Sequence, residues 1–125
     1  MSLEQLTKAH PLDAGRDLRT NQWGEVVHGE IRKFETGIMA DIPPGHVGLI
    51  LDRSSLASRG VKVMGGVVDA GYTGEIIVML ANLVYEPVKI EHGDKIAQLV
   101  VLPLSAYTPG VASERGDGGF GSTGR

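Results

Sequence analysis

One short stretch of the chain combines glycines, valines and an aspartate in an order that could hold a small ligand and activate a water molecule. Residues 65–76 read GGVVDAGYTGEI, and Asp69 lies where the first apolar arm enters a glycine-rich turn. Two apolar arms around such a turn predict a β-hairpin. A carboxylate at its edge could serve as a general base. The alternative is an aspartate that hydrogen-bonds the backbone of its own turn, which is a common use of this residue.

A second candidate site follows from a predicted short helix over residues 54–59. A serine is available as its N-cap, and Gly60 is placed to end it. The first turn of such a helix presents free backbone N–H groups that suit a phosphate. Arg53 lies directly before this helix. The four histidines are scattered without the spacing of metal ligands, so we interpret them as ordinary surface or core residues.

These candidate residues must be positioned by strands, because most of the periodic segments are short, β-branched and bounded by Gly, Pro or Asp. We predict buried strands over 47–51, 76–80 and 96–102, with turns at 43–45 and 92–94. Hydrophobic residues make up 42% of the chain, but only one Trp, three Tyr and two Phe are present, so aliphatic side chains fill the core. The sequence therefore predicts an all-β sandwich or jelly roll.

Composition limits the classes of function. A chain of 125 residues fits one compact domain, and without cysteine it can form neither a disulfide nor a thiolate metal site. The net charge of −3 gives no general attraction for polyanions, so we expect no nucleic-acid partner. No apolar run approaches a membrane span, and the N-terminus lacks the features of a signal peptide. We expect a cytoplasmic protein with no membrane partner.

The last residues differ from the rest in composition. Half of residues 116–125 are glycine, which is too flexible to form a strand or a helix alone. We therefore predict a β domain over residues 1–110 and a mobile C-terminal lid over 111–125 that orders when a ligand binds.

Five segments in order, spanning residues 14–124, resemble the motifs of the trimeric dUTPase family. They are AGRDL at 14–18, RSSLA at 53–57, GVVDAGYTG at 66–74, GDKIAQL at 93–99 and RGDGGFGSTG at 115–124. The resemblance implies a jelly-roll-like (dUTPase-type) β-sandwich with one short helix and a flexible tail. It also implies a homotrimer with shared active sites that uses Mg²⁺ to hydrolyse dUTP to dUMP and pyrophosphate, which limits uracil incorporation into DNA and supplies dUMP for dTMP synthesis.

The resemblance assigns the reacting groups. It implies that Asp69 is the general base for a water that attacks the α-phosphorus in line, which suits a reaction that depends on positioning and charge neutralisation. Asp17 would hold Mg²⁺ through water, although a turn aspartate after Gly15 is the alternative. Arg53 and Ser54 would contact phosphates, or Arg53 could be a surface cation beside a helix cap.

Other residues of these motifs are implied in substrate binding. Val67 and Val68 would recognise uracil through their backbone groups, and Tyr72 would lie against the deoxyribose unless it is a half-buried strand tyrosine. Gln98 would lie near the α-phosphate, or it could be a buried, hydrogen-bonded strand residue. The remaining implied substrate contacts are Ser55, where the family often has glycine, and the tail residues Arg115, Phe120, Gly121, Ser122 and Thr123.

Two other functions compete with dUTP hydrolysis. The related dCTP deaminases carry a glutamate just after the turn aromatic, but this chain has Thr73 there, and Glu75 comes two positions later. A dUTPase-fold protein could also act as a regulatory binding partner. We would expect a non-catalytic descendant to lose some of the residues implied in catalysis, yet Asp17, Asp69, Arg115 and Phe120 are all present.

Overall fold

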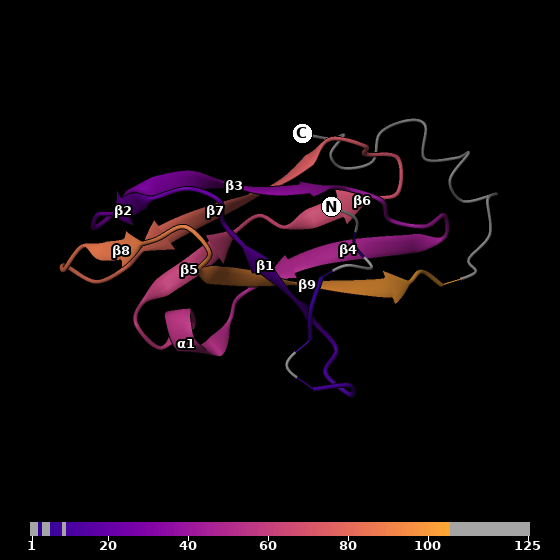
Figure 1. The fold of residues 1–125 in the computed structure, drawn as a ribbon, viewed down its shortest axis with the longest axis horizontal. Helices are drawn as coiled ribbons and strands as arrows, with labels where there is room; N and C mark the ends of the chain where they lie inside the picture. Colours follow the sequence, from indigo (N-terminus) through magenta and orange to yellow (C-terminus); the bar gives the residue numbers. More distant parts are fainter. Residues whose placement is uncertain (1–2, 4–5, 9, 106–125) are drawn as a thin grey trace, which may run out of the picture.

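The computed structural model describes residue 3, residues 6–8 and residues 10–105. Its elements follow one another as a nearly unbroken series of strands with one short helix (Figure 1). In chain order they are β1 (Arg16–Arg19), β2 (Gly24–Val26), β3 (Ile31–Met39), β4 (His46–Leu51), α1 (Ser54–Ala57), β5 (Val61–Met64), β6 (Val67–Asp69), β7 (Glu75–Asn82), β8 (Val88–Ile90) and β9 (Lys95–Pro103).

The strands form three antiparallel sheets. A four-stranded sheet has the order β1-β9-β4-β6, a three-stranded sheet has the order β3-β7-β5, and β2 pairs with β8. The three predicted strands are confirmed as parts of β4, β7 and β9. Both predicted turns are also confirmed, because the N–H of His46 donates to Pro43 O at 3.1 Å and that of Asp94 donates to Glu91 O at 2.9 Å.

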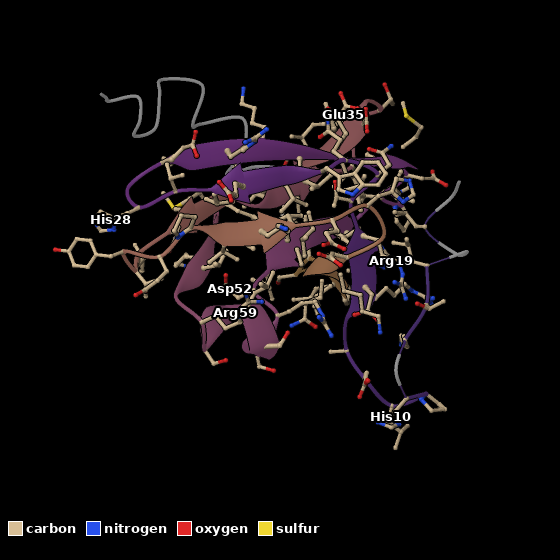
Figure 2. All side chains as sticks on the ribbon, turned by 60° about the vertical axis from the view of Figure 1, so that its left-hand side comes forward. His10, Arg19, His28, Glu35, Asp52 and Arg59 are labelled. Atoms are coloured by element: carbon tan, nitrogen blue, oxygen red, sulfur yellow. The ribbon has the colours of Figure 1, made fainter. Side chains whose placement is uncertain are left out.

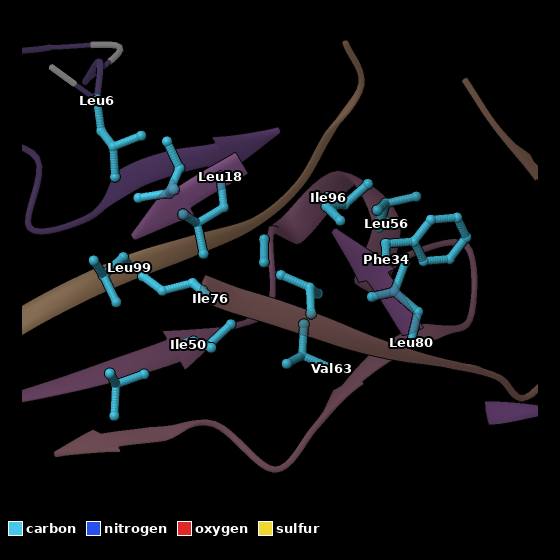
Figure 3. Close-up of a cluster of buried hydrophobic side chains, with 14 of the residues drawn as sticks. Leu6, Leu18, Phe34, Ile50, Leu56, Val63, Ile76, Leu80, Ile96 and Leu99 are labelled. Atoms are coloured by element: carbon cyan, nitrogen blue, oxygen red, sulfur yellow. The ribbon is translucent and has the colours of Figure 1, made fainter. Parts of the chain in front are cut away.

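The two larger sheets pack face to face over one aliphatic core (Figures 1 and 3). The four-stranded sheet contributes Leu18, Ile50, Ile96 and Leu99, among others, and the three-stranded sheet contributes Phe34, Val63, Ile76 and Leu80. Each fully buried side chain of this size stabilises the fold by about 1.5–3 kcal/mol relative to an exposed one. The sandwich predicted from the sequence is therefore confirmed, with β-branched and leucine side chains as its main filling.

The hairpin predicted over residues 65–76 is wrong in one respect, because its two arms do not pair with each other. β6 pairs with β4 in the four-stranded sheet, whereas β7 pairs with β3 and β5 in the other sheet. The turn itself forms, since the N–H of Tyr72 donates to Asp69 O at 3.0 Å. Both arms are apolar, and each arm buries its side chains by joining a different sheet of the sandwich. The chain therefore changes sheets twice, at Gly65–Gly66 and again at this turn.

The predicted helix is confirmed in place but differs at both ends. The N-cap residue is Arg53, with extended φ and ψ of −95° and 138° and no side-chain capping bond, so no serine caps the helix. The α-helix ends at Ala57. The backbone hydrogen bond that follows, from the N–H of Arg59 to Leu56 O, joins residues three apart instead of four. Gly60 follows with φ of +90°, as expected for a residue that ends a helix. No helix in the described part of the chain is long and apolar enough to cross a membrane.

Candidate active site

Asp69 lies at the rim of a pocket where the chain passes between the two sheets. This pocket, which we call the β6–β7 pocket, has a volume of about 300 Å³, and its lining includes Val67, Val68, Asp69, Tyr72 and Glu75. Four of the residues implied by the sequence in base recognition and catalysis are therefore neighbours. The volume is at the lower end of the range for small-molecule sites, which is about 300–1,000 Å³.

The backbone of β6 is available to a ligand, because β6 is the last strand of its sheet and pairs on one side only. Val47, Gly48 and Leu49 of β4 pair with Asp69, Val68 and Val67 on that side. In an antiparallel ladder, alternate N–H and C=O groups of an edge strand face away from its partner. The side chain of Val68 is buried and that of Val67 is exposed, so the strand is fixed by packing from one face.

Tyr72 is held over its own turn. Its hydroxyl donates to the carbonyl oxygen of Glu75 at 2.7 Å, and a Cβ added at Gly74 would lie 2.6 Å from that hydroxyl. Glycine at position 74 is therefore what leaves room for the ring. Tyr72 lies between β6 and β7 and its side chain is exposed, so the alternative of a half-buried strand tyrosine is wrong.

The Asp69 carboxylate is exposed and accepts no hydrogen bond from the described residues; the turn uses the backbone carbonyl of Asp69 instead. The alternative of an aspartate that hydrogen-bonds its own turn backbone is therefore not what the geometry shows. A nearby glutamate is held differently, since Glu75 Oε2 accepts from the N–H of Gly37 at 2.9 Å. Of these two carboxylates, Asp69 is the one that accepts no hydrogen bond from the described residues.

A separate pocket surrounds Asp17. It has a volume of about 260 Å³, and we call it the Asp17 pocket. Its lining residues are Asp13, Ala14, Gly15, Asp17, Arg53, Ser54 and Gln98. Asp17 lies within strand β1, so the alternative of a turn aspartate is wrong. The pocket therefore brings together the carboxylate, the cation and the hydroxyl that the sequence implied for phosphate and metal binding.

Two cations flank the Asp17 carboxylate. Arg53 Nε lies 3.4 Å from one oxygen and Lys95 Nζ lies 3.4 Å from the other, while the side chain of Asp17 is 13% exposed. Charge-assisted hydrogen bonds are usually about 2.7–2.9 Å long, so both ion pairs are loose and leave lone pairs of the carboxylate accessible. Within the described residues, no group of three His, Cys, Asp or Glu side chains could hold a metal ion directly. The carboxylates that line the pocket are those of Asp13 and Asp17, so a metal here would take most of its ligands from water.

Gln98 and Ser55 are placed differently from the other implied phosphate contacts. The Gln98 amide nitrogen donates to Asp52 O at 2.8 Å, so part of its hydrogen-bonding capacity already serves the fold. Ser55 accepts a bond from Arg53 Nη1 at 3.3 Å and lines a neighbouring pocket rather than the Asp17 pocket. The implied tail contacts Arg115, Phe120, Gly121, Ser122 and Thr123 lie outside the described residues.

The β6–β7 pocket and the Asp17 pocket are far apart in one chain. Asp17 and Asp69 lie on opposite edge strands of the four-stranded sheet, which are about 14 Å apart across three strand spacings. Asp17 pairs with Gln98 of β9, which pairs in turn with Leu51 of β4. Asp69 pairs with Val47 of β4, and the offset from Leu51 to Val47 adds about 13 Å along the strand direction. The two pockets share no lining residue. A single chain therefore holds the two carboxylates in separate pockets at opposite edges of the sheet.

Sequence reasoning missed several residues at these sites. Lys95 belongs to the fourth motif but was given no role, and its contact with Asp17 depends on the pairing of β1 with β9. Asp13 lines the Asp17 pocket, and Glu75 lines the β6–β7 pocket. The available signal for the first of these was a lysine directly before the apolar residues that begin the predicted strand over 96–102.

A family model described as dUTPase matches residues 2–124 of the chain. The chain is similar to the deoxyuridine 5'-triphosphate nucleotidohydrolase of Anaeromyxobacter sp. (strain Fw109-5), with 45% identity over 120 residues that span 90% of this chain and 82% of the relative. It is also similar to the enzyme of that name from Mycolicibacterium gilvum (strain PYR-GCK), with 46% identity over 132 residues that span 94% of this chain and 86% of the relative.

The chain is also similar to solved structures of dUTPases. The EIAV dUTPase has a TM-score of 0.77 and 31% identity, covering 83% of this chain and 87% of that one. A mutant dUTPase from phage phi11 of S. aureus, described as coordinating a structural Mg(II) ion, has a TM-score of 0.77 and 25% identity, covering 83% of this chain and 86% of that one. These neighbours confirm the jelly-roll-like β-sandwich expected from the sequence. By its match along almost the whole chain and its likeness to these relatives, the protein belongs to the dUTPase family.

Proposed function

We propose that this protein hydrolyses dUTP to dUMP and pyrophosphate, the activity for which its relatives are named. The observation that carries the proposal is the β6–β7 pocket, which combines an unpaired strand edge with an unoccupied carboxylate, Asp69, at its rim. By removing dUTP, the reaction limits uracil incorporation into DNA, and it supplies dUMP for dTMP synthesis.

In the proposed complex, the uracil edge pairs with backbone groups of Val67 and Val68. A fixed strand edge presents one order of donors and acceptors, so cytosine would leave buried polar groups unpaired, which is discriminated strongly. Thymine differs from uracil by one methyl group, and a pocket rejects a methyl group well only when its walls are stiff. The packing of Val68 and the anchored ring of Tyr72 provide such walls, and Tyr72 would also exclude a 2′-hydroxyl.

In the proposed reaction, the Asp69 carboxylate accepts a proton from a water molecule. The water oxygen then forms a bond to the α-phosphorus, and the bond from that phosphorus to the bridging oxygen of pyrophosphate breaks. Arg53 and Ser54 would hold the phosphates by charge and hydroxyl hydrogen bonds, with Ser55 and Gln98 as further contacts. Phosphoryl transfer depends mainly on such positioning and charge neutralisation, which is what these residues can supply.

Asp17 is the residue proposed to hold Mg²⁺ through metal-bound water. Mg²⁺ keeps much of its hydration shell, so it suits a polar pocket whose carboxylates are those of Asp17 and Asp13, the latter with its Oδ2 accepting from the N–H of His10 at 3.0 Å. When bound there, the ion would neutralise charge on the triphosphate oxygens. The 3.4 Å ion pairs with Arg53 and Lys95 keep the Asp17 carboxylate in place without saturating it.

The separation of Asp17 from Asp69 supports a homotrimer with shared active sites. A complete site would take its β6–β7 pocket from one copy and its Asp17 pocket from another, because a single chain holds them on the order of 20 Å apart. Closed cyclic assemblies make each such contact once per copy. On sequence grounds, we further propose that residues 111–125 close over the nucleotide, with Phe120 on the base and Arg115, Gly121, Ser122 and Thr123 on the phosphates.

The test is pyrophosphate release from dUTP beside dCTP, dTTP and UTP, each with and without Mg²⁺. We expect turnover of dUTP in the presence of Mg²⁺, with the other three nucleotides at least about 100-fold slower by kcat/KM. The dCTP sample is also assayed for ammonia, because Glu75 lines the same pocket as Asp69. Ammonia from dCTP without pyrophosphate from dUTP would make the protein a deaminase and contradict the proposal.

A further inference from the structure

A third pocket contains mainly cationic side chains. It has a volume of about 310 Å³, and we call it the basic pocket. Its cations are Arg19, Arg53, Arg59, Lys89 and Lys95. Arg53 lines both this pocket and the Asp17 pocket, so the two pockets adjoin at one guanidinium group.

The fold gathers these cations from separate parts of the chain. Arg19 ends β1, Arg59 follows α1, Lys89 lies in β8 and Lys95 begins β9. Figure 2 shows Arg59 beside the helix α1 and Arg19 beside the strand β1. Arg19 is fixed toward the turn between β8 and β9, because its Nη1 donates to Gly93 O at 2.8 Å. The basic pocket is therefore a product of tertiary structure rather than of a run of basic residues.

The charge of the basic pocket is only partly balanced by the described residues, because Arg53 and Lys95 pair with Asp17 while the other three cations have no such partner. Arg19, Arg59 and Lys89 form no ion pair with any described residue. The one acidic lining residue is Asp94, whose Oδ2 already accepts from the N–H of Glu91 at 2.8 Å. Cations that converge on one concave surface raise the local positive potential, which attracts small anions. In a chain with a net charge of −3, such a concentration of positive charge is local.

We propose that the basic pocket binds inorganic pyrophosphate free of metal, a role that rests on the proposed dUTP hydrolysis as the source of pyrophosphate. Pyrophosphate carries several negative charges on two linked groups, so it can contact cations on more than one wall. The Asp17 carboxylate would repel a bare anion in the neighbouring pocket and favour a metal-bound one. The basic pocket sets three cations without an ion pair among the described residues, Arg19, Arg59 and Lys89, against the one lining carboxylate of Asp94, so it favours the bare anion. Through Arg53, bound pyrophosphate competes with the phosphates of a new substrate molecule.

The first experiment measures pyrophosphate binding to the full chain by calorimetry in EDTA at fixed ionic strength. The double variant Arg59→Gln with Lys89→Gln removes two cations of the pocket. The control, Lys33→Gln with Lys62→Gln, removes the same charge from exposed strand positions outside it. We expect at least about tenfold weaker binding in the first double variant and less than about twofold in the control. Equal losses in the two variants, or no loss in the first, would overturn the proposal.

The second experiment locates the anion through backbone amide NMR signals. Gly93 lines the basic pocket and Gly15 lines the Asp17 pocket. In EDTA, pyrophosphate should shift the Gly93 signal, and in excess Mg²⁺ it should shift that of Gly15. A shift of Gly15 alone in EDTA would contradict the proposal, even where a variant is too unstable for calorimetry.

Measurements of dUTP hydrolysis distinguish failure of the pyrophosphate site from failure of the proposed function. The Arg59→Gln with Lys89→Gln variant should hydrolyse dUTP within about twofold of the unmodified protein at saturating Mg²⁺, because neither residue lines the β6–β7 pocket or the Asp17 pocket. If the unmodified protein binds pyrophosphate in EDTA at Gly93 but does not hydrolyse dUTP, the proposed function fails and the anion site stands. If it hydrolyses dUTP and the Gly93 signal does not move, the anion site fails alone.

Discussion

At the scale of single residues, the position of Asp69 determines what it can do. It is the last residue of β6, its side chain is exposed, and the described residues leave its carboxylate without a hydrogen bond. Asp17 is the opposite case, since it is mostly buried and held between Arg53 and Lys95. A base must gain and lose a proton, whereas a residue that holds a metal through water must keep its place. The two carboxylates are suited to these two different roles.

Replacing Asp69 by asparagine should leave the fold and nucleotide binding intact while lowering kcat by about 10²–10⁴-fold, because the amide keeps the shape but cannot accept the proton. Pyrophosphate release measures kcat, and binding of a non-hydrolysable dUTP analogue checks affinity. Asp41→Asn is the matched control, since Asp41 is an exposed loop aspartate that lines neither pocket. Near-normal turnover by the Asp69 variant would remove Asp69 from the mechanism.

At the scale of elements, the turn between β6 and β7 fixes the ring of Tyr72. The hydrogen bond from its hydroxyl to Glu75 O and the absence of a side chain at Gly74 act together. The bond closes a loop of four residues, so the orientation of the ring follows from the conformation of the turn. In the proposed complex, sugar discrimination would then depend on this turn as much as on the tyrosine itself.

Gly74→Ala should displace the Tyr72 ring and lower the ratio of kcat/KM for dUTP to that for UTP by about tenfold or more. Its control is Gly71→Ala in the same turn, where an added Cβ meets nothing within 4 Å. Steady-state kinetics on both nucleotides gives the ratio. If the two variants discriminate equally well, the ring is positioned by contacts other than its own turn.

The change of sheets before β6 depends on Gly66. Its φ is +127°, its carbonyl accepts from the N–H of Ile50 at 2.7 Å, and an added Cβ would lie 2.5 Å from Ile50 O. A residue with a side chain at position 66 would therefore have both a strained backbone and a clash with the backbone oxygen of Ile50. Because β6 carries Asp69, this glycine also places the proposed base.

Gly66→Ala should lower the free energy of unfolding by about 3 kcal/mol or more, since the neighbouring backbone must move as well. Gly45→Ala isolates the strain term, because Gly45 has φ of +79° but open space around it. We expect Gly45→Ala to lower the free energy of unfolding by about 1 kcal/mol. Denaturant unfolding at one protein concentration compares the two, as stability depends on concentration in an oligomer. Similar losses of stability in the two variants would show that the contact between the added Cβ and Ile50 O costs little free energy.

At the scale of the whole molecule, the sandwich places the two proposed halves of a site at opposite edges of one sheet. β1 carries Asp17 at one edge and β6 carries Asp69 at the other. Each edge strand exposes groups that a second chain can approach. Assembly would then complete the site, and a single chain would bind the nucleotide only in part.

Shared sites predict complementation between two inactive variants. Coexpressed Asp69→Asn and Asp17→Asn chains should assemble at random, so that about a quarter of all sites combine an intact Asp69 from one copy with an intact Asp17 from another. Turnover near a quarter of the unmodified value is expected, whereas each variant alone stays low. Sedimentation checks the trimer mass. No recovery in mixed trimers would mean that both carboxylates act within one chain.

The sequence by itself determined the strands β4, β7 and β9, the place of the helix and the family, because these depend on local patterns of apolar residues, glycines and short motifs. It could not determine that the arms around Asp69 join different sheets, since both arms are apolar and sheet membership depends on distant partners. It could not place Lys95 beside Asp17 or gather Arg19, Arg59 and Lys89 around one pocket, because these contacts join residues that are far apart along the chain. Tertiary structure also decided the separation of Asp17 from Asp69, because that distance is set by the order of strands in a sheet, which no local pattern encodes.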